Sequence, residues 1–257
     1  MCPLAILPLL LSASPQAPGG TAPEAETARL EEAVRQSPAS AGAWKQLGLA
    51  LAARRNLDSA LPAFARACEL APGDEDACYY LARNLYTLGR YQEAREPFDK
   101  ALRSAPPPLQ AKVHRAAALN FIALTRPDDA ERHFREALRL TGGPARAGED
   151  PRIDYGAFLF RQGRAAEAFP LLDLAVRAHP GSARAHTELG KVLLHLGKPE
   201  AAAARLQKAV ELDPGSSTAR LLLGKTYLAL GRAEEGQKQL RLGQQAWKRS
   251  YGSSTVK

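Results

Sequence analysis

One pattern of small and bulky residues recurs six times along this chain, at spacings of 34, 36, 38, 34 and 34 residues. Each unit holds a small residue, a bulky apolar residue four positions later and a second small residue three positions after that. The first small residues are Ala60, Ala94, Ala130, Ala168, Ala202 and Gly236. A period of this length fits one pair of helices, and one pair cannot bury its apolar face alone. The pattern therefore predicts a stacked array of helix pairs rather than a domain with one central core.

The residues between and beyond the small ones have regular positions too. The bulky positions hold Phe64, Phe98, Phe134, Leu172, Leu206 and Leu240. Proline or glycine stands near the end of the first five units, at Pro72, Pro106, Gly142, Pro180 and Pro214. Because proline cannot continue a helix, the second helix of a unit should end there. The first helices should end in a left-handed residue at Gly89, Gly163, Gly197 and Gly231.

The first unit carries the pattern most fully, with Trp44, Leu47, Gly48, Leu51, Ala60, Phe64 and Pro72. This resembles the tetratricopeptide repeat (TPR), a helix–turn–helix of 34 residues. Six units fit: 41–74, 75–108, 111–144, 149–182, 183–216 and 217–250. The resemblance implies an all-α, right-handed superhelical solenoid of antiparallel helix pairs. The third unit matches least, and we expect the superhelix to bend or loosen on both sides of it.

Short segments remain at both ends of the repeats. Residues 24–37 match only the second helix of a unit, so we expect a lone helix that covers the first repeat. The TPR solenoid should then span residues 24–250, and residues 251–257 should form a flexible tail.

The N-terminal stretch has the residue order of an export signal. Residues 1–13 form a short apolar run, small residues follow it, and a Pro/Gly-rich stretch continues to residue 23. This order is typical of a secretory signal peptide, although no Lys or Arg precedes the run; a start codon further upstream would supply one. We therefore expect residues 1–23 to be a signal peptide and linker, and the chain to be periplasmic or secreted. The alternative is an apolar tail on a cytoplasmic protein.

The net charge of +8, from 35 Lys and Arg against 27 Asp and Glu, is spread along the chain. No run of five or six like charges marks a nucleic-acid-binding arm. No stretch of about 18 continuous apolar residues marks a membrane span. The composition favours a solvated helical surface, so we expect neither nucleic acid nor a membrane span.

Two of the three cysteines lie close together in the repeat frame. Cys68 falls near the end of the second helix of unit one, and Cys78 takes the position in unit two that Trp44 takes in unit one. Because these helices are neighbours, a disulfide between the two is one interpretation for an exported chain. Two small buried apolar residues are the other.

Catalytic motifs are missing from the sequence. The five histidines do not cluster, and there is no H-E-x-x-H, C-x-x-C, G-x-S-x-G or phosphate-binding loop. His114 and His186 take the position of Trp44, where we expect packed ring substitutes. Because the repeats occupy most of the chain, we expect no enzyme activity, no metal and no cofactor.

The TPR resemblance implies that the first helices line a concave groove that holds a partner peptide. By repeat position, the inward-looking residues include Lys45, Leu49, Tyr79, Arg83, Tyr86, Arg115, Leu119, Ile122, Ile153, Phe160, Arg161, Lys191, Leu194, His195, Leu221, Lys225 and Leu228. Tyr79, Arg83 and Tyr86 follow an i, i+4, i+7 spacing on one helix face. Tyr and Arg often anchor interfaces, which favours a binding role. In the other interpretation the tyrosines only support neighbouring helices.

The sequence as a whole predicts a non-catalytic adaptor or scaffold in the bacterial cell envelope. Its ligand would be a protein or peptide with apolar anchors and acidic residues. Two alternatives stay open: a structural protein that associates with itself, and an auxiliary subunit of an envelope enzyme complex. TPR arrays share a scaffold while their ligands differ, so the identity of the partner does not follow from the pattern.

Overall fold

The structure is a computed structural model that describes residues 22–71, 76–141 and 148–251. These ranges contain thirteen α-helices and no β-strand. The helices are α1 (Ala22–Gln36), α2 (Ala41–Ala53), α3 (Leu57–Leu70), α4 (Ala77–Thr87), α5 (Arg95–Ser104), α6 (Pro107–Ala123), α7 (Pro127–Leu140), α8 (Pro151–Arg161), α9 (Ala165–Ala178), α10 (Ala183–His195), α11 (Pro199–Leu212), α12 (Ser217–Ala229) and α13 (Ala233–Tyr251). Residues 1–21 of the expected export signal and residues 252–257 of the expected tail lie outside the described residues.

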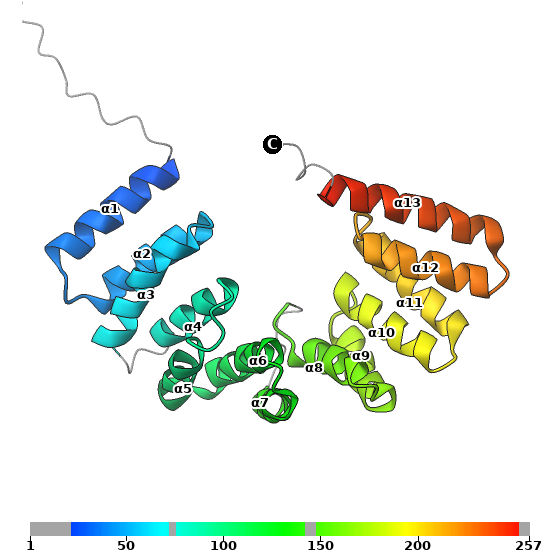
Figure 1. Cartoon of the computed structure of the whole chain (residues 1–257), viewed down its shortest axis with the longest axis horizontal. Helices are drawn as coiled ribbons and strands as arrows, with labels where there is room; N and C mark the ends of the chain where they lie inside the picture. The colour runs from blue at the N-terminus through cyan, green and yellow to red at the C-terminus, as the bar shows by residue number, and fades with distance from the viewer. Residues whose placement is uncertain (1–21, 72–75, 142–147, 252–257) are drawn as a thin grey trace, which may run out of the picture.

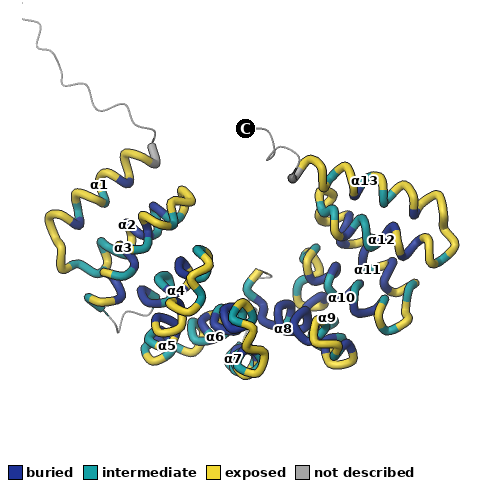
Figure 2. The backbone as a smooth tube through the Cα atoms, viewed as in Figure 1, coloured by how far each residue is buried: buried dark blue, intermediate teal, exposed yellow. Residues whose placement is uncertain are grey.

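The helices form an open arc, with α1 at one end and α13 at the other (Figure 1). Each pair from α2–α3 to α12–α13 contacts the pairs next to it, and α1 packs on α2. Buried positions follow the faces where neighbouring helices meet (Figure 2). The prediction of an all-α solenoid of antiparallel helix pairs is confirmed.

Close approach of the two helices within a pair depends on glycine. A Cβ on Gly48 of α2 would lie 2.6 Å from ring atoms of Phe64 on α3. The same crowding, within 2.6–2.8 Å of the partner helix, occurs at Gly156, Gly190 and Gly224. The bulky partner side chains Phe64, Leu172 and Leu206 are at most 2% exposed. In these pairs, the bulky side chain of the second helix therefore packs directly against the glycine of the first helix.

The turn inside each pair requires a left-handed residue. Gly89, Gly163, Gly197 and Gly231 have φ between +70° and +77°, which confirms the prediction made from their positions. In the first and third pairs the same place is taken by Arg55 (φ +59°) and Thr125 (φ +55°), which the repeat pattern did not indicate. A side chain in this conformation costs about 1–2 kcal/mol relative to glycine. These two turns are therefore the strained ones.

A side chain at the Trp44 position ties the start of a first helix to the turn before it. Trp44 donates its indole N–H to the carbonyl oxygen of Pro38 at 2.9 Å. His186 makes the equivalent contact through Nε2 to Pro180 at 3.1 Å, and Arg220 through Nε to Pro214 at 2.9 Å. Serines cap the same three helices: Ser40, Ser182 and Ser216 each accept a hydrogen bond from the backbone N–H three residues later.

Candidate functional site

The aromatic and basic trio expected on α4 is partly exposed. The guanidinium of Arg83 lies 5.6 Å from the ring centroid of Tyr79, and Arg83 itself is exposed. Tyr86 is half-buried against Tyr91, with ring centroids 5.5 Å apart. Burial is the main cause that raises the pKa of Tyr86, and the charges of Tyr91 and Asp154 add to it. Of the trio, Arg83 thus presents a cation over an aromatic ring, with no ion pair in the part of the chain that the structure describes.

An open pocket with a volume of about 540 Å³ lies between α2 and α4, and of the trio Arg83 lines it while Tyr79 and Tyr86 do not. Its lining is Leu49, Ala52, Ala53, Arg55, Leu57, Phe64, Tyr80, Arg83, Asn84 and Thr87. Leu49 and Arg83 are therefore brought to one hollow, as members of the expected groove should be. Arg55, Asn84 and Thr87 were not among the residues that the repeat positions indicated.

A buried carboxylate connects the first helices of the third, fourth and fifth pairs. Asp154 on α8 is 3% exposed and accepts a hydrogen bond from Arg115 Nε on α6 at 2.5 Å. Its other oxygen accepts from Arg184 on α10. Arg115 was expected to face a ligand, but its guanidinium is held in this ion pair and its side chain is 19% exposed. Asp154 and Arg184 were missed from the sequence, because a charged residue on a helix usually faces solvent.

Further polar contacts join α7 to α8, where the third and fourth pairs meet. Glu131 accepts hydrogen bonds from Arg164 at 2.7 Å and from the hydroxyl of Tyr155 at 3.0 Å. The bond from Arg164 is the largest cause that lowers the pKa of Glu131. Lys112 of α6 pairs with Glu149 at 3.1 Å. Charge therefore supplements apolar packing at this junction.

The remaining expected groove residues divide into three groups. Arg161 and Lys225 are exposed and have no ion pair within the described ranges. Lys45 pairs with Asp76 at 2.7 Å, and Lys191 pairs with Glu188 at 2.7 Å. The apolar members Leu119, Ile122 and Phe160 are half-buried.

Ile153 does not belong to this surface. Its side chain is 1% exposed and lies within the core shared by the third to fifth pairs, so the expectation that it faces a ligand is wrong. The residues around it on α8 are buried as well, because this helix packs on both neighbours. The repeat position of Ile153 predicts a side chain that faces the groove, as on the other first helices, but α8 is more deeply buried than they are.

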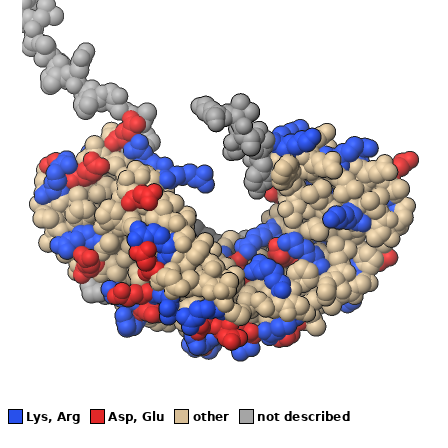
Figure 3. All heavy atoms as spheres, viewed as in Figure 1, with Lys and Arg blue, Asp and Glu red and all other residues tan. Residues whose placement is uncertain are grey.

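Basic side chains are distributed unevenly around the arc (Figure 3). Acidic and basic residues alternate along the outer rim in this view. Many ion pairs of the chain join residues one helical turn apart, such as Arg135 with Glu131 and Arg139 with Glu136. Several Lys and Arg side chains lie on the inner side of the C-terminal half, with acidic side chains among them.

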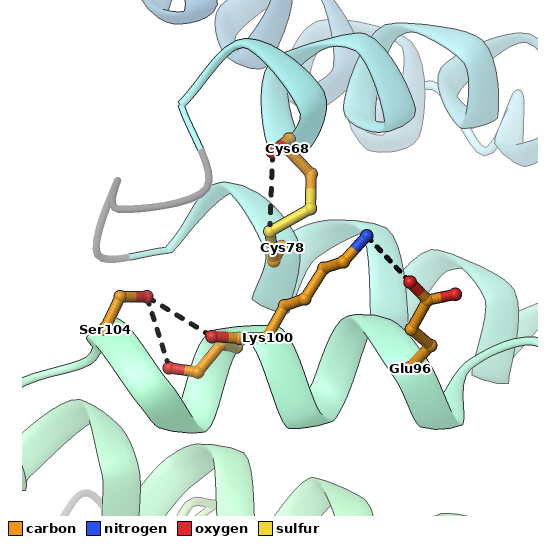
Figure 4. The surroundings of a disulfide bond; sticks show 6 residues. Cys68, Cys78, Glu96, Lys100 and Ser104 are labelled. Atoms are coloured by element: carbon orange, nitrogen blue, oxygen red, sulfur yellow. Dashed lines mark hydrogen bonds and ion pairs between the residues drawn. A yellow bond between two sulfur atoms is a disulfide. The ribbon is translucent and has the colours of Figure 1, made fainter.

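The two cysteines of the first two pairs are joined. Cys68 at the end of α3 and Cys78 at the start of α4 form a disulfide with an S–S distance of 1.97 Å (Figure 4). Both residues are at most 3% exposed. The bond fixes the first turn of α4, directly before Tyr79 of the trio. The groove residues of α4 are therefore anchored covalently to the preceding pair.

Two of the five histidines contact each other inside the third pair, so the expectation that the histidines do not cluster is wrong for this pair. His114 of α6 and His133 of α7 lie with their Nδ1 atoms 2.9 Å apart, and His133 stacks on Phe121 with centroids 5.1 Å apart. Burial lowers the pKa of both rings, that of His133 to about 4. The charged neighbours are Asp129, Arg132, Glu136 and Arg139. Since two protonated rings would repel, this contact requires at least one neutral ring.

We expect the free energy of unfolding to fall as pH is lowered from about 6.5 to 4. The unfolded chain takes up the His133 proton near the usual pKa of 6.5, whereas the folded chain takes it up only near 4. Folding is therefore disfavoured by protonation, by about 1–2 kcal/mol for a partly solvated ring. Urea titrations at several pH values should show this loss, and His133→Phe should reduce its slope. An unchanged slope in the variant would assign the pH dependence to other groups.

Two models of known protein families match the chain. One model described as tetratricopeptide repeat matches residues 51–119, 159–211 and 193–246, and a second matches residues 25–75 and 115–183. The first alone covers more than half of the chain. The chain belongs to the tetratricopeptide repeat family. This family is generally non-catalytic, and its members bind protein or peptide partners.

Solved structures give the same fold. PilW, described as a widely conserved type IV pilus biogenesis factor, superposes with a TM-score of 0.68 at 20% identity, over 84% of this chain and 94% of that one. PilF of Pseudomonas aeruginosa gives 0.60 at 26% identity, over 67% and 76%. YrrB, described as a TPR protein with an unusual peptide-binding site, gives 0.54 at 22% identity, over 74% and 95%. The search of curated proteins found no match.

Other kinds of site are not seen in the part of the TPR chain that the structure describes. No group of three or more His, Cys, Asp or Glu residues could hold a metal ion there. None of the described helices is long and apolar enough to cross a membrane. The candidate site therefore consists of the pocket between α2 and α4 and of three exposed cations on first helices, which have no ion pair within the described residues: Arg83, Arg161 and Lys225.

Proposed function

We propose that this TPR protein is a non-catalytic adaptor that binds a segment of a partner protein in the groove lined by its first helices. The observation that carries the proposal is on α4, where Arg83 lies over the Tyr79 ring, lines an open pocket and has no ion pair within the described residues. Tyr86 follows one helical turn later. Rigid aromatic rings and guanidinium groups are the side chains that most often dominate binding energy. The free cations Arg161 and Lys225 on later first helices would extend the contact to acidic residues.

We further propose that the protein works in the bacterial cell envelope. The disulfide between Cys68 and Cys78 supports this, because such bonds persist in oxidising compartments and are rare in the cytosol. The apolar residues at the N-terminus support it independently. Fusion of residues 1–23 to an alkaline phosphatase that folds only outside the cytosol should give an active enzyme. An inactive fusion, with the protein recovered from the cytosol, would contradict export.

Binding in the groove predicts loss of a partner when the α4 cluster is removed. The full chain and a Tyr79→Ala/Arg83→Ala/Tyr86→Ala variant serve as parallel baits in a native extract. Each hot-spot truncation costs about 2 kcal/mol or more, so a specific partner retained by the parent should disappear from the variant. Quantitative mass spectrometry of the two eluates measures this.

The control for this capture carries substitutions away from the groove. Leu174 is 49% exposed on α9, and Arg177 on the same helix is exposed and pairs only with a residue one turn away. Leu174→Ala/Arg177→Ala should retain the same partner as the parent. If the control loses the partner and the α4 variant keeps it, the outer surface and not the groove is the binding site.

A further inference from the structure

The pocket between α2 and α4 combines an apolar lining with two cations. Leu49, Leu57, Phe64 and Tyr80 contribute most of its large side chains. Arg55 comes from the turn between α2 and α3, and Arg83 from α4. Such a hollow is large enough for one bulky side chain of a peptide.

Neither guanidinium group has an ion-pair partner within the described residues. The guanidinium of Arg83 lies over the face of Tyr79, and the side chain of Arg55 has no ion pair or hydrogen bond among those residues. Their neighbour Arg54 behaves differently, since it reaches Thr27 and Glu24 of α1. Two exposed guanidinium groups that line one hollow without a carboxylate leave room for an anionic group of a ligand.

Asn84 is a second unsatisfied group of the lining. It is 4% exposed and donates its Nδ2 hydrogen to the carbonyl oxygen of Leu57 at 2.8 Å. Its Oδ1 atom has no hydrogen-bond partner. Buried polar atoms without a partner are uncommon in native structures. Asn120, at the same position of the third pair, donates to the carbonyl oxygen of Tyr91 at 2.9 Å and also has an unpaired Oδ1, so the arrangement recurs in the array and the two arginines carry the argument for this pocket.

The backbone of Arg55 adds an independent observation. Four of the six equivalent turns use glycine for their left-handed residue, and only Arg55 and Thr125 carry side chains there. Thr125 is on the third pair and does not line this pocket. Arginine at a glycine position is strained, and such strain commonly persists at binding sites.

We propose that this pocket is the anchor site for an acidic peptide segment of the partner protein, with a large apolar side chain in the hollow and a neighbouring carboxylate bound between Arg55 and Arg83. The proposal rests on the proposed adaptor function and specifies its ligand. Apolar lining selects the anchor, and the unpaired guanidinium groups select an Asp or Glu beside it. Arg55 keeps its strained backbone because its side chain binds the ligand.

A matched pair of variants separates binding from stability. Arg55→Gly removes the guanidinium and relieves the left-handed turn, so it should raise the melting temperature by about 2–4 °C. Thr125→Gly relieves the equivalent turn two pairs away and should raise it similarly. Only Arg55→Gly removes a group from the pocket. A loss of binding confined to this variant therefore cannot come from unfolding.

The probe is a library of random octapeptides displayed on phage, selected on the full chain. Recovered peptides should carry Phe, Leu or Trp next to Asp or Glu. In fluorescence anisotropy, Arg55→Gly should weaken a recovered peptide about tenfold, the loss expected for one charge-assisted contact, and Thr125→Gly should leave its affinity unchanged. Ala53→Phe, which fills the hollow from its rim, should weaken the same peptide independently of charge.

Two results would overturn the proposal, and they differ in what they say about the adaptor function. Peptides that lack an acidic residue, or that bind Arg55→Gly as well as the parent while Tyr86→Ala weakens them, would place the ligand elsewhere in the groove and leave the adaptor function standing. A selection that enriches no peptide above a bare-support control, together with no partner in the capture experiment, would contradict both.

Discussion

Phe134→Ala should lower the free energy of unfolding by about 3–5 kcal/mol. The ring of Phe134 is 0% exposed and lies at the junction of the third and fourth pairs. It stacks on Tyr155 with centroids 5.3 Å apart and tilts against Phe158 at 5.7 Å, both on α8. Truncation would leave a cavity at a junction that already relies on charge. Urea denaturation followed by helical circular dichroism measures the loss.

The control for this prediction is a truncation of an exposed side chain. Leu174→Ala removes a residue that is 49% exposed and should change stability by less than about 0.5 kcal/mol. Because repeat arrays can lose cooperativity, Phe134→Ala should also separate the unfolding of the two halves of the arc. Equal urea midpoints for Phe134→Ala and Leu174→Ala would show that the stability of the third and fourth pairs does not depend on the Phe134 ring.

Gly190→Ala should destabilise the protein by about 1–3 kcal/mol, although alanine is the better helix former. A Cβ at this position would lie 2.7 Å from the Cγ and Cδ2 atoms of Leu206, which is fully buried on α11. The helices α10 and α11 would have to move apart, or Leu206 would have to leave its rotamer. Thermal and urea unfolding both report the effect.

Two further variants test the cause of that destabilisation. Gly42 lies in the first turn of α2 with no atom within 4 Å of an added Cβ, so Gly42→Ala should be neutral or stabilising. Leu206→Ala alone should cost about 2–5 kcal/mol. Combined with Gly190→Ala it should cost less than the sum of the two, because the small side chain removes the clash. Additive costs would mean that the clash is not the cause.

The sequence predicted the parts of the fold that repeat. Small residues such as Ala60 and Ala202 and bulky ones such as Phe64 and Leu206 occur at fixed spacing, because the same packing contact recurs in each pair. The left-handed glycines were predicted for the same reason. The left-handed conformation of Arg55 was not predicted, because neither the composition nor the repeat period indicates that an arginine adopts a conformation typical of glycine.

The candidate site was predictable only in outline. Repeat position placed Tyr79 and Arg83 on a first helix, and Arg83 lines the pocket whereas Tyr79 does not. It could not show that Arg115 is engaged by Asp154, because the two are 39 residues apart and either could have faced solvent. Ile153 was misplaced because the burial of α8 depends on both of its neighbours. Contacts that occur once in an array leave no periodic signal.

The arc described above also limits how such a protein changes in evolution. Each helix pair contacts the pairs beside it, so duplication or deletion of one pair would recreate a junction of the same kind. Duplication of a gene segment could thereby lengthen the groove by one helix pair at a time, without substitutions in a core that all pairs share. The pocket, formed by the first two pairs near α1, would be inherited unchanged while the far end of the arc varied in length.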